Sequence, residues 1–222
     1  MTLGCIRLML HFGGKMSFVV LYDCEFLTAP GAPMRFWCGP QDPDPLCIQI
    51  GAVRLSLETD FEFSDPVGWF VTPLDRDGRV VSVDPLVTRL CGISDELLRD
   101  EGVALSVAMA ALADFAQGSL LLGWGKDELL TFAASLFVQG LSSPIPAAQF
   151  RNAPPLLLSA GEDIETVHKL RSNTICDHYG LDAPGPAHDA RADAAGVATA
   201  LQHLLRTGKL HPDDFTALAP AT

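Results

Sequence analysis

The sequence predicts an α/β fold in which a mixed sheet, an antiparallel meander plus parallel strands, is flanked by helices. Three strand-like segments precede the first long helical pattern, and this order is typical of an antiparallel meander. Further along the chain, short apolar runs are interspersed with segments of helical periodicity. The chain contains no internal repeat and no linker long enough to divide it, so one domain is expected.

The three strand-like segments lie near the start of the chain. Residues 18–26 form an apolar run that only two acids interrupt, as expected for a buried central strand. After a long Pro- and Gly-rich loop over residues 28–45, residues 46–55 and 61–72 carry the apolar, aromatic and β-branched residues that favour strands. Residues 75–78, Asp-Arg-Asp-Gly, predict a turn.

The remainder of the chain is mainly helical in pattern. Ser94 is a good N-cap for a helix that begins at Asp95, and Gly180 is a good C-cap for the helix before it. A short buried strand is expected at residues 119–123, and the loop at residues 144–155 can hold another. Helices are expected over residues 103–117, 126–139, 162–179 and 188–206.

The single domain is expected over residues 16–210, with a disordered N-terminal extension at residues 1–15 and a peripheral tail at residues 211–222. No apolar stretch reaches the roughly 18–20 residues needed to span a bilayer, so no membrane partner is expected. The six cysteines form no Cys-x-x-Cys pair, and several lie in apolar runs, as buried free thiols do. These features indicate a reducing, cytoplasmic location.

The formal net charge of −12 argues against a protein that binds duplexes through a broad basic face. The charge is compatible with an enzyme that grips a few nucleotides and uses bound cations to neutralise its own carboxylates. An acidic surface suits a protein partner as well.

Three Asp-x-Glu pairs occur, and their surroundings distinguish them. The pair at residues 60–62 lies at a solvated strand end, and the pair at residues 163–165 lies where a helix starts. Asp23 and Glu25 alone interrupt a buried strand, and the two-residue period of a strand points both to one face. Two such carboxylates are costly in a core unless a divalent cation binds them. The alternative is that residue 23 begins a loop.

A second cluster, His188-Asp-Ala-Arg-Ala-Asp193, lies near the start of the last long helix. A histidine can transfer protons because its pKa lies near neutral pH. The small residues Ala190 and Ala194 indicate that this helix packs closely on the sheet. The alternative is a helix capped by Asp189, with His188 exposed and without a function.

A third acid, Asp127, follows the short strand and lies in the first turn of the next helix. Its neighbour Glu128 is expected to be exposed. Taken alone, Asp127 is explained as an ordinary acid at a helix start. The preceding residues 123–126, Gly-Trp-Gly-Lys, do not meet the phosphate-loop pattern, which excludes a P-loop NTPase.

In combination these motifs resemble the DEDD superfamily of 3′–5′ exonucleases, histidine subclass, which includes RNase T and the proofreading subunit of DNA polymerase III. The likeness is greatest to the subgroup of histone-mRNA 3′-end exonucleases, and it spans about residues 17–206. The chain departs from the family pattern in Phe26, where many members have threonine, in the long loop at residues 28–45, and in Cys91, which replaces a threonine. The residues that match the family's motif are Asp23, Glu25, Asp127, His188 and Asp193.

The resemblance implies a ribonuclease-H-like fold and metal-dependent hydrolysis of single-stranded RNA or DNA from the 3′ end to nucleoside 5′-monophosphates. It further implies that two Mg²⁺ or Mn²⁺ ions are held by carboxylates, with His188 as general base. The implied metal ligands are Asp23, Glu25, Asp127 and Asp193.

Aromatic and apolar residues near these motifs are candidates for substrate contacts. Phe26, Leu27 and Trp124 can stack on or wedge the terminal bases, with core packing as the alternative role of each. The alternative function is a proofreading-type or non-catalytic nucleic-acid-binding module associated with a polymerase or another protein partner. A homodimer is also compatible with the sequence.

Overall fold

The computed structural model describes residues 16–218. The expected N-terminal extension at residues 1–15 lies outside the described residues. Within residues 16–218, no helix combines the length and the apolar character needed to cross a bilayer.

A five-stranded mixed sheet forms the centre of the molecule, with strand order β3-β2-β1-β4-β5. The pairs β1–β2 and β2–β3 are antiparallel, whereas β1–β4 and β4–β5 are parallel, so the predicted fold class is confirmed. The strands are β1 (Phe18–Phe26), β2 (Cys47–Ser56), β3 (Val67–Phe70), β4 (Leu121–Gly123) and β5 (Phe150–Asn152).

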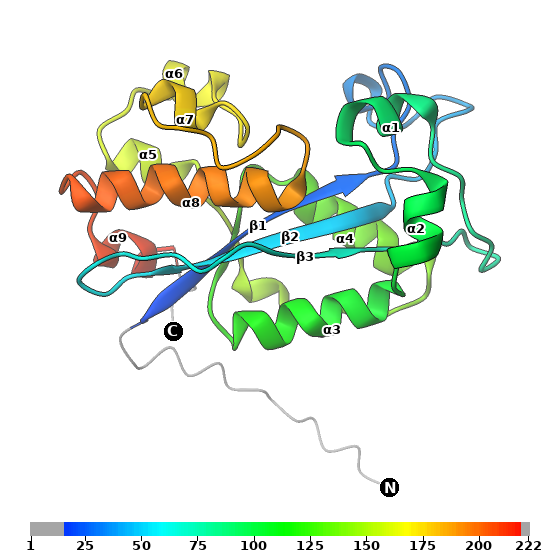
Figure 1. Ribbon diagram of the computed structural model, residues 1–222, viewed down its shortest axis with the longest axis horizontal. Helices are drawn as coiled ribbons and strands as arrows, with labels where there is room; N and C mark the ends of the chain where they lie inside the picture. Colours follow the sequence, from blue (N-terminus) through cyan, green and yellow to red (C-terminus); the bar gives the residue numbers. More distant parts are fainter. Residues whose placement is uncertain (1–15, 219–222) are drawn as a thin grey trace, which may run out of the picture.

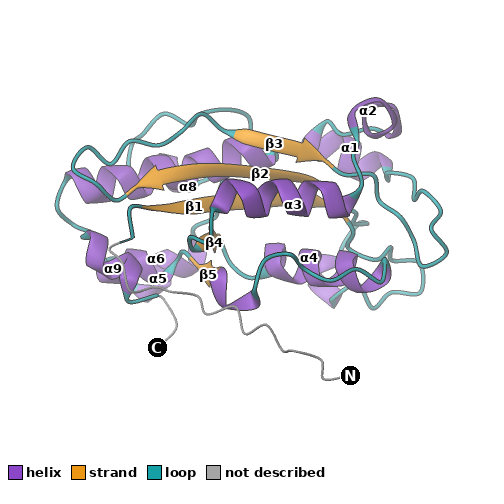
Figure 2. Cartoon of the chain, turned by 90° about the horizontal axis from the view of Figure 1, so that it is seen from below, coloured by secondary structure: helices purple, strands orange, loops and turns teal. Residues whose placement is uncertain are grey.

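Helices cover both faces of this sheet (Figures 1 and 2). The longest helix, α8, crosses one face of β1 and β2, and α3 lies on the other face. The helices are α1 (Pro85–Cys91), α2 (Asp95–Glu101), α3 (Leu105–Ala116), α4 (Asp127–Val138), α5 (Pro155–Ser159), α6 (Ile164–Lys169), α7 (Ile175–His178), α8 (Ala190–Arg206) and α9 (Pro212–Thr216). Two short 3₁₀ helices are Pro33–Arg35 and Ala147–Gln149.

The side chains of β1 point alternately to the two faces of the sheet and so contribute to the apolar core on both. Val19 and Leu21 pack with α8, whereas Val20 and Tyr22 pack with α3 and α4. Residues two apart in a strand share a face. The acids at positions 23 and 25 therefore continue the row that faces α8, beyond the point where the apolar residues end.

The N-terminus of α8 is fixed against β2 by a close backbone approach. A β-carbon on Gly51 would lie 2.1 Å from the carbonyl carbon of Ala190, so only glycine fits there. The side chain of Gln49 accepts a hydrogen bond from the Ala190 amide (3.1 Å) and donates one to Asp189 Oδ1 (3.1 Å). The predicted close packing of this helix on the sheet is confirmed, and it sets where the first turn of α8 lies.

The expected single helix over residues 162–179 is wrong. Helix α6 ends at Lys169, and Leu170 adopts an extended conformation with its side chain buried. A new turn then begins, in which the amide of Arg171 donates to Thr174 Oγ1 (3.0 Å). Burial of Leu170 and this local cap together outweigh the helical periodicity.

Three further differences from the expected elements concern shorter segments. Strand β3 is confined to four residues of the expected 61–72, with two isolated bridges, from Phe63 to Leu55 and from Val71 to Val103. Helices α1 and α5 were not expected. The tail is not peripheral throughout, because α9 inserts Phe215 into the core beside α8, where it is fully buried.

Candidate active site

One cavity of about 280 Å³ collects all five motif residues. It lies where β1 ends, at the N-termini of α4 and α8 and beside the segment that separates α6 from α7. Segments more than 100 residues apart in the sequence thus contribute to one site. Its lining residues are Asp23, Cys24, Glu25, Phe26, Trp124, Asp127, Glu128, Arg171, Ser172, Asn173, His188 and Asp193.

The carboxylates of this cavity lie close together in surroundings that disfavour charge. Burial, followed by the negative charges of Glu128, Asp193 and Glu25, raises the pKa of Asp23 well above its usual range. Burial, with Asp193 and Asp189 nearby, raises the pKa of Glu25 to about 8. Such mutual repulsion is what a bound divalent cation would relieve.

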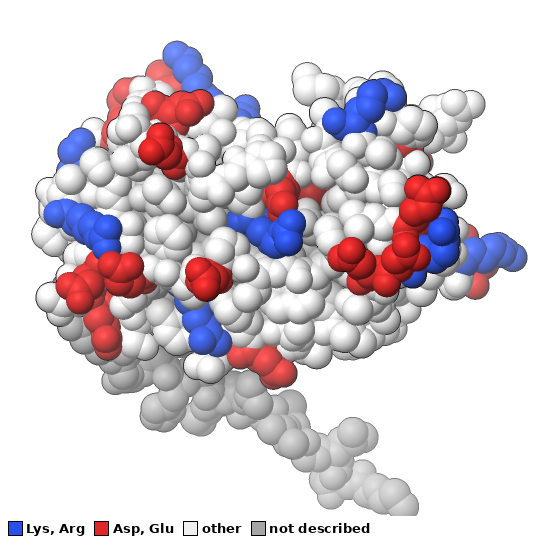
Figure 3. Space-filling model, in the orientation of Figure 1, with Lys and Arg blue, Asp and Glu red and all other residues white. Residues whose placement is uncertain are grey.

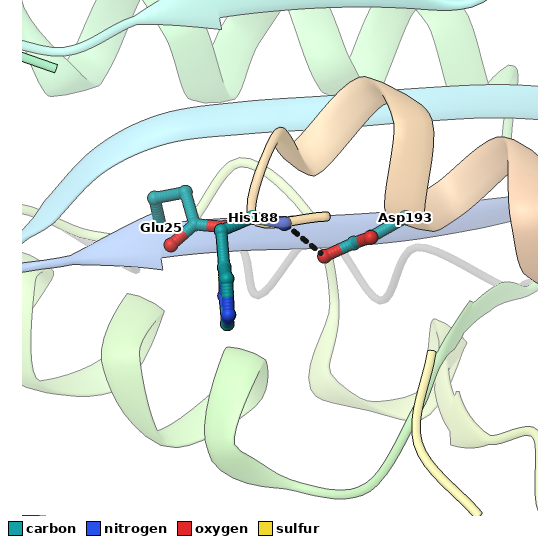
Figure 4. A group of neighbouring side chains, drawn as sticks. All are labelled: Glu25, His188 and Asp193. Atoms are coloured by element: carbon teal, nitrogen blue, oxygen red, sulfur yellow. Dashed lines mark hydrogen bonds between the residues drawn. The ribbon is translucent and has the colours of Figure 1, made fainter. Parts of the chain in front are cut away.

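Asp193 holds the segment that carries His188 (Figure 4). Oδ2 of Asp193 accepts a hydrogen bond from the backbone amide of His188 at 3.2 Å. Burial raises the pKa of Asp193 to about 6, while the hydrogen bond from His188 opposes this rise. Glu25, His188 and Asp193 each offer one ligand atom within 4.8 Å of those of the other two, so the histidine ring lies beside the carboxylates.

His188 has a backbone conformation that is uncommon for a residue other than glycine. Its φ of 63° lies in the left-handed region, which histidine, asparagine and aspartate tolerate better than most residues. Asp189 follows as the N-cap of α8 and accepts from the Arg191 amide at 3.0 Å. The alternative interpretation from the sequence is therefore right that Asp189 caps the helix. His188, however, lines the cavity and is not an isolated surface residue.

The prediction that Glu128 is exposed is wrong. Glu128, expected to be exposed, is buried with 4% of its surface accessible, whereas Asp127 is exposed at the cavity edge. Burial and the neighbouring Asp127 raise the pKa of Glu128 to about 8. Glu128 is a lining residue that the sequence interpretation missed.

Of the three candidates for base contacts, two line the cavity. Phe26 is half-buried and packs edge-on against Trp37, with ring centroids 5.7 Å apart. Trp124 is largely buried, and its Nε1 donates to the carbonyl of Leu170 at 3.3 Å, so it also packs in the core. Leu27 is not among the lining residues and instead belongs to the core, with 2% of its surface accessible.

The two remaining Asp-x-Glu pairs have structural roles. Asp163 caps α6 by accepting from the amide of Thr166 at 2.9 Å. Glu62 pairs with Arg206 at 2.7 Å on the surface. Neither pair lines the cavity, as their sequence surroundings predicted.

Positive charge is scarce at this site. Among the described residues, Arg171 is the only lysine or arginine that lines the cavity. Its Nη1 donates to the carbonyls of His168 (2.9 Å) and Leu170 (2.7 Å), which fixes the guanidinium on the segment between α6 and α7. On the face shown in Figure 3, acidic side chains lie in the hollow between the α6–α7 region and the α1 region, and the basic ones form no broad patch.

No protein-family model matches the sequence, and no curated protein matches it. Several solved structures match it at sequence identities between 14% and 17%. The nuclease domain of 3′hExo, a DEDDh family member, bound to rAMP, aligns with a TM-score of 0.67 and 16% identity over 86% of this chain and 93% of that one. A 3′-exonuclease bound to the histone mRNA stem-loop gives 0.68 and 15%, over 88% and 84%.

A third structural relative is larger than this chain. E. coli ExoI in its zinc-bound complex with single-stranded DNA aligns with a TM-score of 0.59 and 17% identity, over 90% of this chain but only 43% of that one. The structural neighbours of the chain are thus DEDDh-family 3′ exonucleases, and the ribonuclease-H-like fold that the sequence resemblance implied is confirmed.

Proposed function

We propose that this chain is a metal-dependent 3′–5′ exonuclease that hydrolyses single-stranded nucleic acid to nucleoside 5′-monophosphates. The observation that carries the proposal is the convergence of Asp23, Glu25, His188 and Asp193 with the acids of α4 in one cavity. The fold shared with DEDDh exonucleases supports the same activity.

The chemistry of the lining residues fits divalent metal ions. The cavity offers carboxylate oxygens at short mutual distances, which suits Mg²⁺ or Mn²⁺ better than the thiolate and imidazole sets that select zinc. Asp23, Glu25, Asp193 and an acid of α4 would hold two ions. When bound, such a pair stabilises the attacking and leaving oxygens of an in-line displacement at phosphorus.

The protein residues supply proton transfer and positioning. His188 is the general base: its imidazole lies beside Glu25 and Asp193 and accepts the proton of the attacking water. Asp193 positions His188 through the hydrogen bond to its amide. Phe26 stacks against the terminal base from the cavity edge.

The substrate is a single strand with a free 3′ end. A cavity of about 280 Å³ suits a terminal nucleotide better than a duplex. The relatives were solved with rAMP, with a histone mRNA stem-loop and with single-stranded DNA, so both RNA and DNA strands belong in the test. A cytoplasmic location, a homodimer and a polymerase-associated assembly remain predictions.

The polarity of cleavage tests this function. With Mn²⁺ or Mg²⁺, the purified protein should shorten 5′-labelled single strands one nucleotide at a time, and EDTA should stop the reaction. A strand whose 3′ end is blocked should resist. Equal cleavage of blocked and free strands would identify an endonuclease, and no cleavage or binding of either RNA or DNA would reject the proposal.

Arg171 is expected to contact a substrate phosphate, because it is the one lysine or arginine that lines the cavity among the described residues. Arg171→Ala should raise KM and reduce the slope of log affinity against log salt by about 0.7, the value for one lost contact to a single strand. The matched control is Arg99→Ala, which removes an exposed arginine that lines a different cavity. An unchanged salt slope in Arg171→Ala would exclude a phosphate contact.

A further inference from the structure

Helix α4 presents two adjacent acids to the cavity, Asp127 and Glu128, and they differ in burial and in their position around the helix. Glu128 begins the buried side of the helix, which continues with Thr131, Phe132 and Ser135 at three- and four-residue intervals. Asp127 is turned by about 100° from Glu128 and is itself exposed, as is Leu130 three residues later, with 56% of its surface accessible. The helix therefore directs Glu128, and not Asp127, toward the sheet.

The carboxylate of Glu128 reaches the ends of the central strands. A β-carbon on Gly123, the last residue of β4, would lie 3.1 Å from Glu128 Oε2. Glu128 shares its burial with Asp23 and Asp193: these three cavity carboxylates have 4%, 7% and 6% of their surface accessible, whereas Asp127 is exposed. Glu128 is therefore the acid of α4 that lies inside the cavity with Asp23.

The buried oxygen of Glu128 is also unsatisfied. Oε2 has no hydrogen-bond partner among the described residues, although the side chain is almost fully buried. A buried carboxylate without a partner destabilises the folded protein, and a bound ligand would remove this cost. The surrounding acids cannot donate to it when ionised, and a cation can satisfy all of them together.

We infer that Glu128, in place of the expected Asp127, is the fourth metal-binding carboxylate of the cavity. This inference rests on the proposed function, since it concerns the same metal site. Asp127 is an exposed acid at the cavity edge, where it contributes to the local negative potential without holding an ion.

Calorimetric titration with Mn²⁺ distinguishes the two acids without recourse to activity. Glu128→Gln keeps the size of the side chain and removes its charge, and it should weaken Mn²⁺ binding at least about 10-fold, the loss typical even for residues that only support a ligand. Asp127→Asn, the matched control one residue away, should change Mn²⁺ affinity less than threefold, as expected of an acid outside the coordination shell. The rise in Tm on Mn²⁺ addition should be smaller in Glu128→Gln and normal in Asp127→Asn.

The outcomes separate this inference from the proposed function. A wild-type protein that neither binds Mn²⁺ nor cleaves strands rejects both. If the wild type binds Mn²⁺ and Asp127→Asn loses that binding while Glu128→Gln keeps it, the assignment alone is overturned. If Glu128→Gln does not fold, the Mn²⁺ titration of Asp127→Asn tests the assignment by itself. An unchanged Mn²⁺ affinity supports Glu128 as the ligand, and a lost Mn²⁺ affinity overturns that assignment.

Discussion

Replacement of His188 by alanine is expected to lower kcat by about 10²–10⁴, the range that general acid–base catalysis contributes. The imidazole lies beside Glu25 and Asp193, and no other histidine lines the cavity among the described residues. The affinity for Mn²⁺ should stay within about threefold of wild type, because the proposed ligands are carboxylates and the proposed role of the imidazole is proton transfer. Single-turnover cleavage of a labelled strand measures the first quantity, and calorimetry measures the second.

The backbone of His188 requires a second variant. Because φ is 63°, alanine introduces strain in addition to removing the base. Asparagine tolerates this conformation, so His188→Asn removes the base while it preserves the local backbone. Both variants should lose activity to a similar extent. A strong loss of Mn²⁺ affinity in His188→Asn would instead make the imidazole a metal ligand. An activity within about threefold of wild type would show that the imidazole has no catalytic role, because removal of a general base costs much more than that.

Replacement of Gly51 by alanine should damage both stability and activity. The added carbon would lie 2.1 Å from the backbone of Ala190, so β2 and α8 must separate. Such overpacking costs roughly 1–3 kcal/mol, or more where the backbone must move, which for a chain of this size corresponds to about 2–4 °C in Tm per kcal/mol. Asp193 moves with the helix, and a displacement of about 1 Å in a catalytic group can cost around 10² in rate.

Gly68 provides the matched control for this substitution. It pairs with Gly51 on the neighbouring strand, but its added carbon would meet mainly the side chain of Arg191, which can turn aside. Gly68→Ala should therefore lower Tm less and keep the rate. Denaturant unfolding measures the stability of both variants, and initial cleavage rates measure their activity. Equal effects in the two would show that the β2–α8 contact does not position the site.

The sequence predicted the elements that carry the site better than the elements around it. The run over residues 18–26 and the helix after Asp189 have patterns that burial reinforces, and both form as expected. The helix over residues 162–179 fails because its interruption depends on the burial of Leu170 against Trp124, a contact between distant segments. Periodicity reports local preference and contains no information about such a contact.

The acids of α4 illustrate a different limit. Leu130 and Phe137 are large apolar residues, yet they are 56% and 82% exposed. They lie on the side of Asp127, three and ten residues after it, so the apolar pattern of α4 does not reveal which side faces the sheet. The burial of Glu128 follows from the way the strand end at Gly123 meets the helix, and this is a property of the assembled fold.

Five carboxylates and one arginine line the cavity among the described residues, and under the proposed function this imbalance would couple the binding of metal ions to the binding of the strand. A polyanionic strand is repelled by the acids until cations neutralise them, and bound cations are in turn held more firmly when phosphate oxygens complete their surroundings. Binding of ion and strand would therefore be cooperative, and thermodynamic reciprocity would require each to raise the affinity of the other by the same factor. If it acts as proposed, a protein with a net charge of −12 would bind nucleic acid only when divalent ions are abundant enough to occupy the cavity.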